Sequence, residues 1–84
     1  MVTIDGAVIE ELGVTFAIVV VQQHVLNSPE DARPAFRRYF PGMPIVLAAQ
    51  DAFGTFEYQG RRDLVEFLAS ISPDRIPWKQ YTFS

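Results

Sequence analysis

Residues 42–71, with the sequence GMPIVLAAQDAFGTFEYQGRRDLVEFLASI, contain the most regular pattern of the chain. The proline-led apolar run at 44–49 is typical of a buried strand, and residues 55–59 form a second strand after a turn. Gly60 then precedes residues 61–71, in which apolar residues recur at helical spacing. This stretch therefore predicts a strand, a hairpin partner and a closing helix.

Upstream, residues 14–21 are β-branched and almost continuously apolar. Such a run is expected of a central strand that is covered on both faces. A shorter strand over residues 6–11 precedes it, joined through a turn at Leu12-Gly13. Asp5-Gly6 marks either a two-residue hairpin or a bulge in a single edge strand.

A helix is expected between these two apolar strands. Ser28 is a suitable N-cap, Pro29 suits the first helical position, and the helix is expected to continue to Tyr39. Pro34 would fall inside this helix and remove a backbone donor, so we expect a kink near Arg33. Because a strand, a helix and a strand follow one another, the strands at 14–21 and 44–49 should be parallel.

The complete pattern predicts one small α/β (α+β) domain over residues 1–84. We expect a four-stranded mixed sheet in the order ββαββα, with an aromatic C-terminal tail at 73–84. At the start of the tail, Ser72-Pro73-Asp74 is expected to form a helix cap that is followed by a single turn. The predicted core consists of Phe16, Ile18, Val20, Phe36, Phe40, Ile45, Leu47, Phe56, Leu64, Phe67, Leu68 and Ile71.

From residue 14 to residue 70, this order of elements resembles the C-terminal half of thioredoxins and glutaredoxins. The residues that carry the resemblance are 42–45, Gly-Met-Pro-Ile, and Gly60 before the last helix. The resemblance implies helices on opposite faces of the sheet, a cis peptide bond before Pro44, and contact between a bound substrate and the backbone of Met43. The Cys-x-x-Cys half of that family has no counterpart here. Since the chain contains no cysteine, it lacks the thiolate that thiol–disulfide exchange requires.

The composition of the chain limits the classes of binding partner that we expect. The net charge of −3 and the pI of about 4.9 disfavour nucleic acid or an anionic membrane as the main partner. The run at 14–21 is too short to span a bilayer, and the N-terminal residues lack the basic region of a secretory signal. Together with the absence of cysteine, this composition leads us to expect a cytoplasmic protein with no cofactor. A small core often needs support from association, so a homodimer is also expected.

The start of the last predicted helix offers a candidate anion site. Arg61 and Arg62 in its first turn oppose the helix dipole, and with Gly60 they could hold a phosphate or carboxylate. The alternative is that Asp63 and Glu66 offset the two arginines. The resemblance adds Met43 and Pro44 as candidate ligand-binding positions.

Two other groups are candidates for a functional role. His24, the only histidine, follows the central strand and could act as a general base, or it could be an ordinary loop residue. Arg33, Arg37 and Arg38 form a basic cluster that, together with Arg61, Arg62 and the aromatic residues, could contact nucleic acid; the acidic balance of the chain and the absence of lysine runs disfavour this function.

Trp78, Tyr81 and Phe83 in the tail either cover the core of their own chain or dock on a second copy. No nucleophile, base and orienting group occur together, so we expect no enzymatic activity. The expected function is that of a small protein that associates with itself or with another protein. The alternatives are an anion-binding module at Gly60-Arg61-Arg62 and a peptide binder that pairs with the backbone beside Met43-Pro44.

Overall fold

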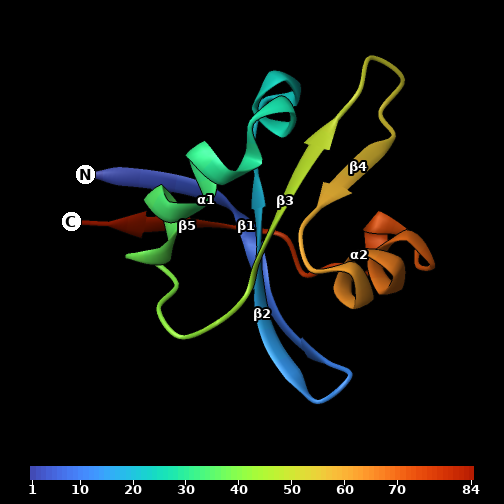
Figure 1. The fold of residues 1–84 in the computed structure, drawn as a ribbon, viewed down its shortest axis with the longest axis horizontal. Coiled ribbons are helices and arrows are strands. Elements are labelled where there is room, and N and C mark those ends of the chain that lie inside the picture. Colours follow the sequence, from blue (N-terminus) through green and yellow to red (C-terminus); the bar gives the residue numbers. More distant parts are fainter.

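The computed structural model describes all residues 1–84 and has an α+β fold with one mixed sheet and two α-helices (Figure 1). The strand order across the sheet is β4-β3-β2-β1-β5. Along the chain the elements are β1 (Val2–Glu11), β2 (Val14–Val20), the 3₁₀ helix η1 (Gln23–Asn27), α1 (Pro29–Arg37), β3 (Ile45–Gln50), β4 (Phe56–Gln59), α2 (Arg62–Ala69), the 3₁₀ helix η2 (Pro73–Arg75) and β5 (Lys79–Phe83).

The sheet has five strands, so the prediction of four was wrong. The additional strand is β5, which lies in the segment predicted as a tail and pairs antiparallel with β1. Its partner lies more than 70 residues earlier in the chain, where Ile4 faces Tyr81. Because the weak alternation of β5 is stabilised only by this distant pairing, local pattern did not identify it.

The predicted βαβ unit is confirmed. β2 and β3 are adjacent and parallel, with Ala17 opposite Ile45 and Val20 opposite Ala48. β3 and β4 form the expected antiparallel hairpin. The two central strands are therefore covered on both faces, which explains why both read as continuous apolar runs.

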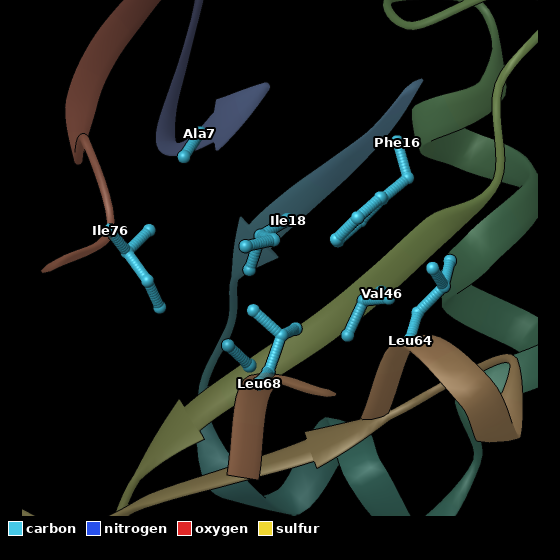
Figure 2. Packing of buried hydrophobic residues seen from close by; sticks show 8 residues of the cluster. Ala7, Phe16, Ile18, Val46, Leu64, Leu68 and Ile76 are labelled. Carbon is cyan, nitrogen blue, oxygen red and sulfur yellow. The ribbon is translucent and has the colours of Figure 1, made fainter. Parts of the chain in front are cut away.

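The two helices cover opposite faces of the sheet (Figure 1). On one face, here called the α2 face, side chains of three strands point towards Leu64 and Leu68 of α2 (Figure 2). On the other, the α1 face, the alternate residues of the same strands pack with residues of α1, η1 and β5. The buried residues of the α2 face are Ala7, Phe16, Ile18, Val46, Ala48, Leu64, Leu68 and Ile76; those of the α1 face are Ile4, Ala17, Val19, Phe40, Ile45 and Leu47.

The predicted core contains residues that are buried in the structure and others that are only partly buried. Seven of the predicted residues are buried, whereas Val20, Phe36, Phe56, Phe67 and Ile71 are only partly buried. The positions that were missed include Ile4 and Ile76, which become buried because β5 joins the sheet beside β1.

Gly6 lies where β1 pairs with both of its neighbouring strands, β2 and β5. β1 is one continuous strand from Val2 to Glu11, so Asp5-Gly6 is not a hairpin. Gly6 is the residue at which pairing changes, because it lies opposite Val19 of β2 and also opposite Lys79 of β5. A Cβ atom at Gly6 would lie 2.1 Å from the carbonyl oxygen of Ile18. Only glycine allows the backbones to approach so closely here.

Helix α1 is shorter than expected and lacks a side-chain cap. It ends at Arg37 rather than at Tyr39, and Ser28 makes no capping hydrogen bond through its side chain. Its backbone carbonyl accepts instead from the N–H of Asp31 at 3.1 Å. Pro34 lies inside the helix as predicted. The predicted cap at the start of the tail is present, since Ser72 accepts from the N–H of Asp74.

No helix in the structure is both long and apolar enough to cross a membrane.

Candidate functional site

Four of the five predicted ligand-binding residues line one pocket of about 320 Å³. This basic pocket lies where β3 begins and β4 ends, beside α1, and the four residues are Met43, Pro44, Gly60 and Arg61. Its remaining lining residues are Glu30, Arg33, Arg37, Ile45 and Gln59. The fold thus brings together two segments that the sequence separates by about 15 residues, and it adds two arginines from α1.

Arg33 connects three elements around this pocket. Its Nε donates to the carbonyl oxygen of Ile45 at 3.2 Å, and its Nη2 donates to the carbonyl oxygen of Gln59 at 3.2 Å and to the Gln59 side chain. Its Nη1 pairs with Glu30. Arg33 is the one buried charged residue, and most of its donors are occupied by the protein itself. Its guanidinium therefore fastens α1 to the start of β3 and the end of β4.

The two arginines at the start of α2 are each paired with a carboxylate. Arg61 Nε lies 2.9 Å from Asp63 Oδ1, and Arg62 Nε lies 3.0 Å from Glu66 Oε1. Asp63 also accepts from the backbone N–H of Leu64 at 3.0 Å. These are the offsetting contacts of the alternative interpretation. Arg62 does not line the basic pocket.

The peptide bond between Met43 and Pro44 is trans, because the structure contains no cis peptide bond. The cis bond that the resemblance implied is therefore absent. The carbonyl oxygen of Pro44 accepts from the N–H of Ala17 at 3.0 Å. β3, the strand that begins after this proline, lies between β2 and β4 and is therefore not an edge of the sheet.

The tail aromatics pack against their own chain. Trp78 stacks on Phe56, with ring centroids 5.1 Å apart, and packs on the α2 face. Phe83 lies 4.8 Å from the ring of Tyr39. Phe40 makes edge-to-face contacts with Tyr81 and Phe83 at 5.4 and 5.8 Å. Each face of the sheet therefore receives part of the tail, as the first of the two interpretations expected.

The outer edge of β5 has no partner strand. β4 and β5 are the two edges of the sheet. β5 pairs with β1 along residues 79–83 without a bulge, and no proline interrupts it. Its backbone groups on the outer side are therefore free to pair with another strand.

The remaining candidates lie apart from one another. His24 is exposed in η1 and shares a surface depression of about 390 Å³ with Glu57. The Arg38 guanidinium lies 5.3 Å from the centre of the Tyr39 ring, while Arg33 points inward, so α1 presents no continuous basic face. No group of three or more His, Asp or Glu side chains is placed to hold a metal ion.

Tyr58 carries the one buried side-chain polar atom without a hydrogen-bond partner, its hydroxyl oxygen. Burial raises the pKa of Tyr58 above its ordinary value of 10.0, because the phenolate form loses hydration. The residue lies on β4 beneath α2, next to a cavity of about 430 Å³. Buried polar atoms without a hydrogen-bond partner are uncommon in native structures, so the hydroxyl of Tyr58 is an unusual feature of this face.

In comparisons with known proteins, no family model, no curated protein and no solved structure matches the chain. The thioredoxin-like relationship stays a prediction.

Sequence reasoning missed the most important residue of the basic pocket. Arg33 was grouped with its neighbours Arg37 and Arg38 as a basic cluster on the first helix. A local signal did exist, because Glu30 lies one helical turn before Arg33 and Ala32 and Phe36 mark the buried side of the helix. The carbonyl partners on β3 and β4 have no sequence signature, since they are backbone atoms.

Proposed function

We propose that this chain is a non-enzymatic domain that associates with a second copy of itself through the outer edge of β5. The observation that carries the proposal is the free edge of a five-residue strand with neither proline nor bulge. Natural sheets usually protect such an edge by shortening it, bending it or inserting charges.

The two sheet edges differ in this protection. β4 has only four residues and is followed at once by Gly60 and α2. β5 is longer and has a single charge, that of Lys79 at its first position. The Lys79 ammonium lies over the ring of Tyr81, 4.7 Å from its centre. The charge of Lys79 therefore protects only one end of the β5 edge against pairing with another strand, and residues 80–83 carry no such protection.

A two-fold symmetric pairing suits the sequence of β5. In an antiparallel pair centred on Tyr81, all five residues find partners, with Lys79 opposite Phe83 and Gln80 opposite Thr82 of the second copy. No like charges face each other in this register. Tyr81 and Phe83 lie on the α1 face, so the aromatic clusters of both copies would lie side by side. The occupant that fits this edge is a second copy of the chain.

The test introduces charges at Gln80 and Thr82, two exposed residues of β5. In Gln80→Lys/Thr82→Lys, four lysines would meet across the two-fold axis, so pairing should be lost. In Gln80→Lys/Thr82→Glu, the introduced lysine of each copy would face the introduced glutamate of the other, so pairing should persist. Sedimentation equilibrium over a concentration series measures the association of both variants and of the wild type.

The matched variants separate pairing from folding, since both alter the same two positions. A dimeric wild type with a monomeric double-lysine variant and a dimeric complementary variant supports the proposal. A wild type that sediments as a monomer at high micromolar concentration overturns it. If both variants dimerise equally well, the dimer interface lies elsewhere and the proposed pairing of β5 strands centred on Tyr81 is wrong.

The basic pocket supports a second candidate function, the binding of a small phosphate or carboxylate. The observation in its favour is that Met43, Pro44, Gly60 and Arg61 converge there with Arg33 and Arg37. Arg37 is exposed, lines the pocket and has no carboxylate within ion-pair distance. An anion there would contact Arg37 and displace Asp63 from Arg61.

Titration with phosphate and acetate, followed by NMR of the amides at 60–63 and the Nε–H of Arg37, tests this candidate. Binding should shift both sets of signals, and Arg37→Gln should weaken it. Arg38→Gln is the matched control, because Arg38 does not line the pocket. Unchanged signals at millimolar anion would rule the candidate out.

A further inference from the structure

Two adjacent cavities lie on the α2 face, apart from the basic pocket; Lys79 and Gln80 of β5 line the larger of the two. The larger, about 710 Å³, is here called the aromatic pocket because Phe56 and Trp78 form its wall. The smaller is the 430 Å³ cavity beside Tyr58, here called the apolar pocket. They share Gly54, Phe56 and Pro73 in their linings. Both volumes lie within the ~300–1,000 Å³ range of small-molecule sites.

The position of the aromatic pocket follows from the shortness of α2. The helix ends at Ala69, and the chain then turns through η2 into β5. The end of the sheet beyond η2 stays uncovered on this face. Val20 and Gln50, the last residues of β2 and β3, line the pocket there. The carboxyl ends of parallel strands are where α/β proteins most often bind ligands.

The aromatic wall is held rigidly. The indole Nε1 of Trp78 donates to the carbonyl oxygen of Pro73 at 3.0 Å. The indole stacks on Phe56 at an interplanar angle of 19°, and Phe56 stacks in turn on Tyr58 at 14°. Because the rings are fixed before any ligand arrives, binding costs little side-chain entropy.

The charge of the aromatic pocket is negative. Asp5 and Asp74 line it from β1 and η2, and neither belongs to an ion pair. Asp5 only accepts a long hydrogen bond of 3.4 Å from the side chain of Gln80. The one cationic lining residue is Lys79, whose ammonium lies over the ring of Tyr81. Two unpaired carboxylates beside an aromatic wall favour a cation.

The apolar pocket suits an uncharged body. Val65, Leu68 and Ile71 line it together with Phe56 and Tyr58. The unpartnered hydroxyl of Tyr58 belongs to one of its lining residues. A ligand that reached past Phe56 would therefore meet apolar side chains in a space separate from the carboxylates.

We infer that these two pockets together bind an amphiphilic organic cation. Its ammonium or guanidinium group lies between Asp5 and Asp74 against the ring of Trp78, and its apolar, ring-sized body extends past Phe56 towards Val65 and Leu68. This inference does not rest on self-association through β5, although Lys79 and Gln80 of that strand also line the aromatic pocket.

Three probes of matched shape test the charge requirement on the wild-type protein. At pH 7 phenethylamine is a cation, 2-phenylethanol is neutral and 3-phenylpropanoate is an anion. Trp78 is the only tryptophan, so its fluorescence and its indole N–H signal report on this pocket alone. Phenethylamine should bind about fivefold or more tightly than 2-phenylethanol, and 3-phenylpropanoate should bind least. Methylamine, which lacks the ring, should bind more weakly than phenethylamine.

Asp74→Asn provides the variant arm, with Glu10→Gln as a control for the loss of one surface carboxylate outside every pocket. Asp74→Asn should weaken phenethylamine binding about threefold and leave 2-phenylethanol unchanged, whereas Glu10→Gln should change neither. Equal affinity for the cationic and neutral probes overturns the inference, as does the absence of any change at Trp78 at millimolar phenethylamine. The wild-type arm needs no variant to fold, so it decides the question alone.

Discussion

The two faces of the sheet are closed in different ways. On the α1 face, the buried guanidinium of Arg33 donates hydrogen bonds to two backbone carbonyls. An aromatic cluster also covers this face, in which Phe40 contacts both Tyr81 and Phe83. The α2 face has a larger buried cluster but is covered by only eight helical residues. It keeps two cavities and a buried hydroxyl without a partner.

This difference separates residues that hold the fold from residues that are free to bind. Contacts on the α1 face are mutually satisfied and bring together α1, β3, β4 and β5. On the α2 face, aromatic and acidic side chains line space that the protein itself does not fill. Substitutions on the α1 face should therefore cost stability, whereas those around the α2 cavities should change binding more than stability.

Phe40→Ala should have the largest effect, a loss of about 3–5 kcal/mol in the free energy of unfolding. Phe40 is 4% exposed, belongs to the buried cluster of the α1 face and contacts the rings of Tyr81 and Phe83 of β5 edge to face. Trp78→Ala on the α2 face should cost less than half as much, because Trp78 is only partly buried. Urea denaturation followed by far-UV circular dichroism measures both. Equal losses would show that the two faces are not closed differently.

Arg33→Met should lower the free energy of unfolding by about 2–3 kcal/mol. The substitution leaves the buried carbonyl of Ile45 without its side-chain donor and frees α1 from the end of β4. Arg62→Met is the control, since Arg62 forms an exposed pair with Glu66 and should be almost neutral. Thermal unfolding of both variants checks this. A loss no larger than that of the control would mean that Arg33 is not an anchor.

Tyr58→Phe should stabilise the protein by about 1 kcal/mol at neutral pH, because it removes a buried hydroxyl without a partner. The pKa of Tyr58 is raised above 10.0 by burial. The effect of the hydroxyl on stability is therefore constant below pH 10, and the wild type loses stability as the pH rises from there through the raised pKa of Tyr58. The variant should lose less stability than the wild type in that alkaline range. Urea midpoints measured from pH 7 upward test both statements, and a destabilised variant would reveal a partner for the hydroxyl.

Leu12→Asn should give the smallest effect, a gain of about 1 kcal/mol or less. Leu12 adopts a left-handed conformation (φ 57°) and Gly13 follows at φ 72°, a turn in which Asn-Gly is favoured. The turn lies outside both faces, so the gain should be the same in the Trp78→Ala background. Stability measured in both backgrounds tests this additivity. A loss of stability would mean that the exposed leucine makes a favourable contact.

The local predictions and their failures have separate causes. The strands at 14–21 and 44–49 were predicted because burial on both faces requires continuous apolar sequence. β5 was missed because its alternation is weak and its partner lies at the other end of the chain. Of the candidate anion site, Gly60 and Arg61 line the basic pocket together with Met43 and Pro44, whereas Arg62 does not. Arg33 had only the local signal of Glu30, Ala32 and Phe36, and the cavities of the α2 face had none beyond single residue types.

The sequence by itself determined the parallel βαβ centre, the hairpin, the closing helix and the absence of thiol chemistry. These follow from the periodicity of apolar residues, from turn residues and from composition, which are all local properties of the chain. Tertiary structure alone decided that the tail becomes a fifth strand, that Arg33 points inward and that Asp5, Asp74 and Trp78 surround one cavity. Those outcomes depend on backbone pairing and close packing between segments far apart in the chain, which no local pattern records.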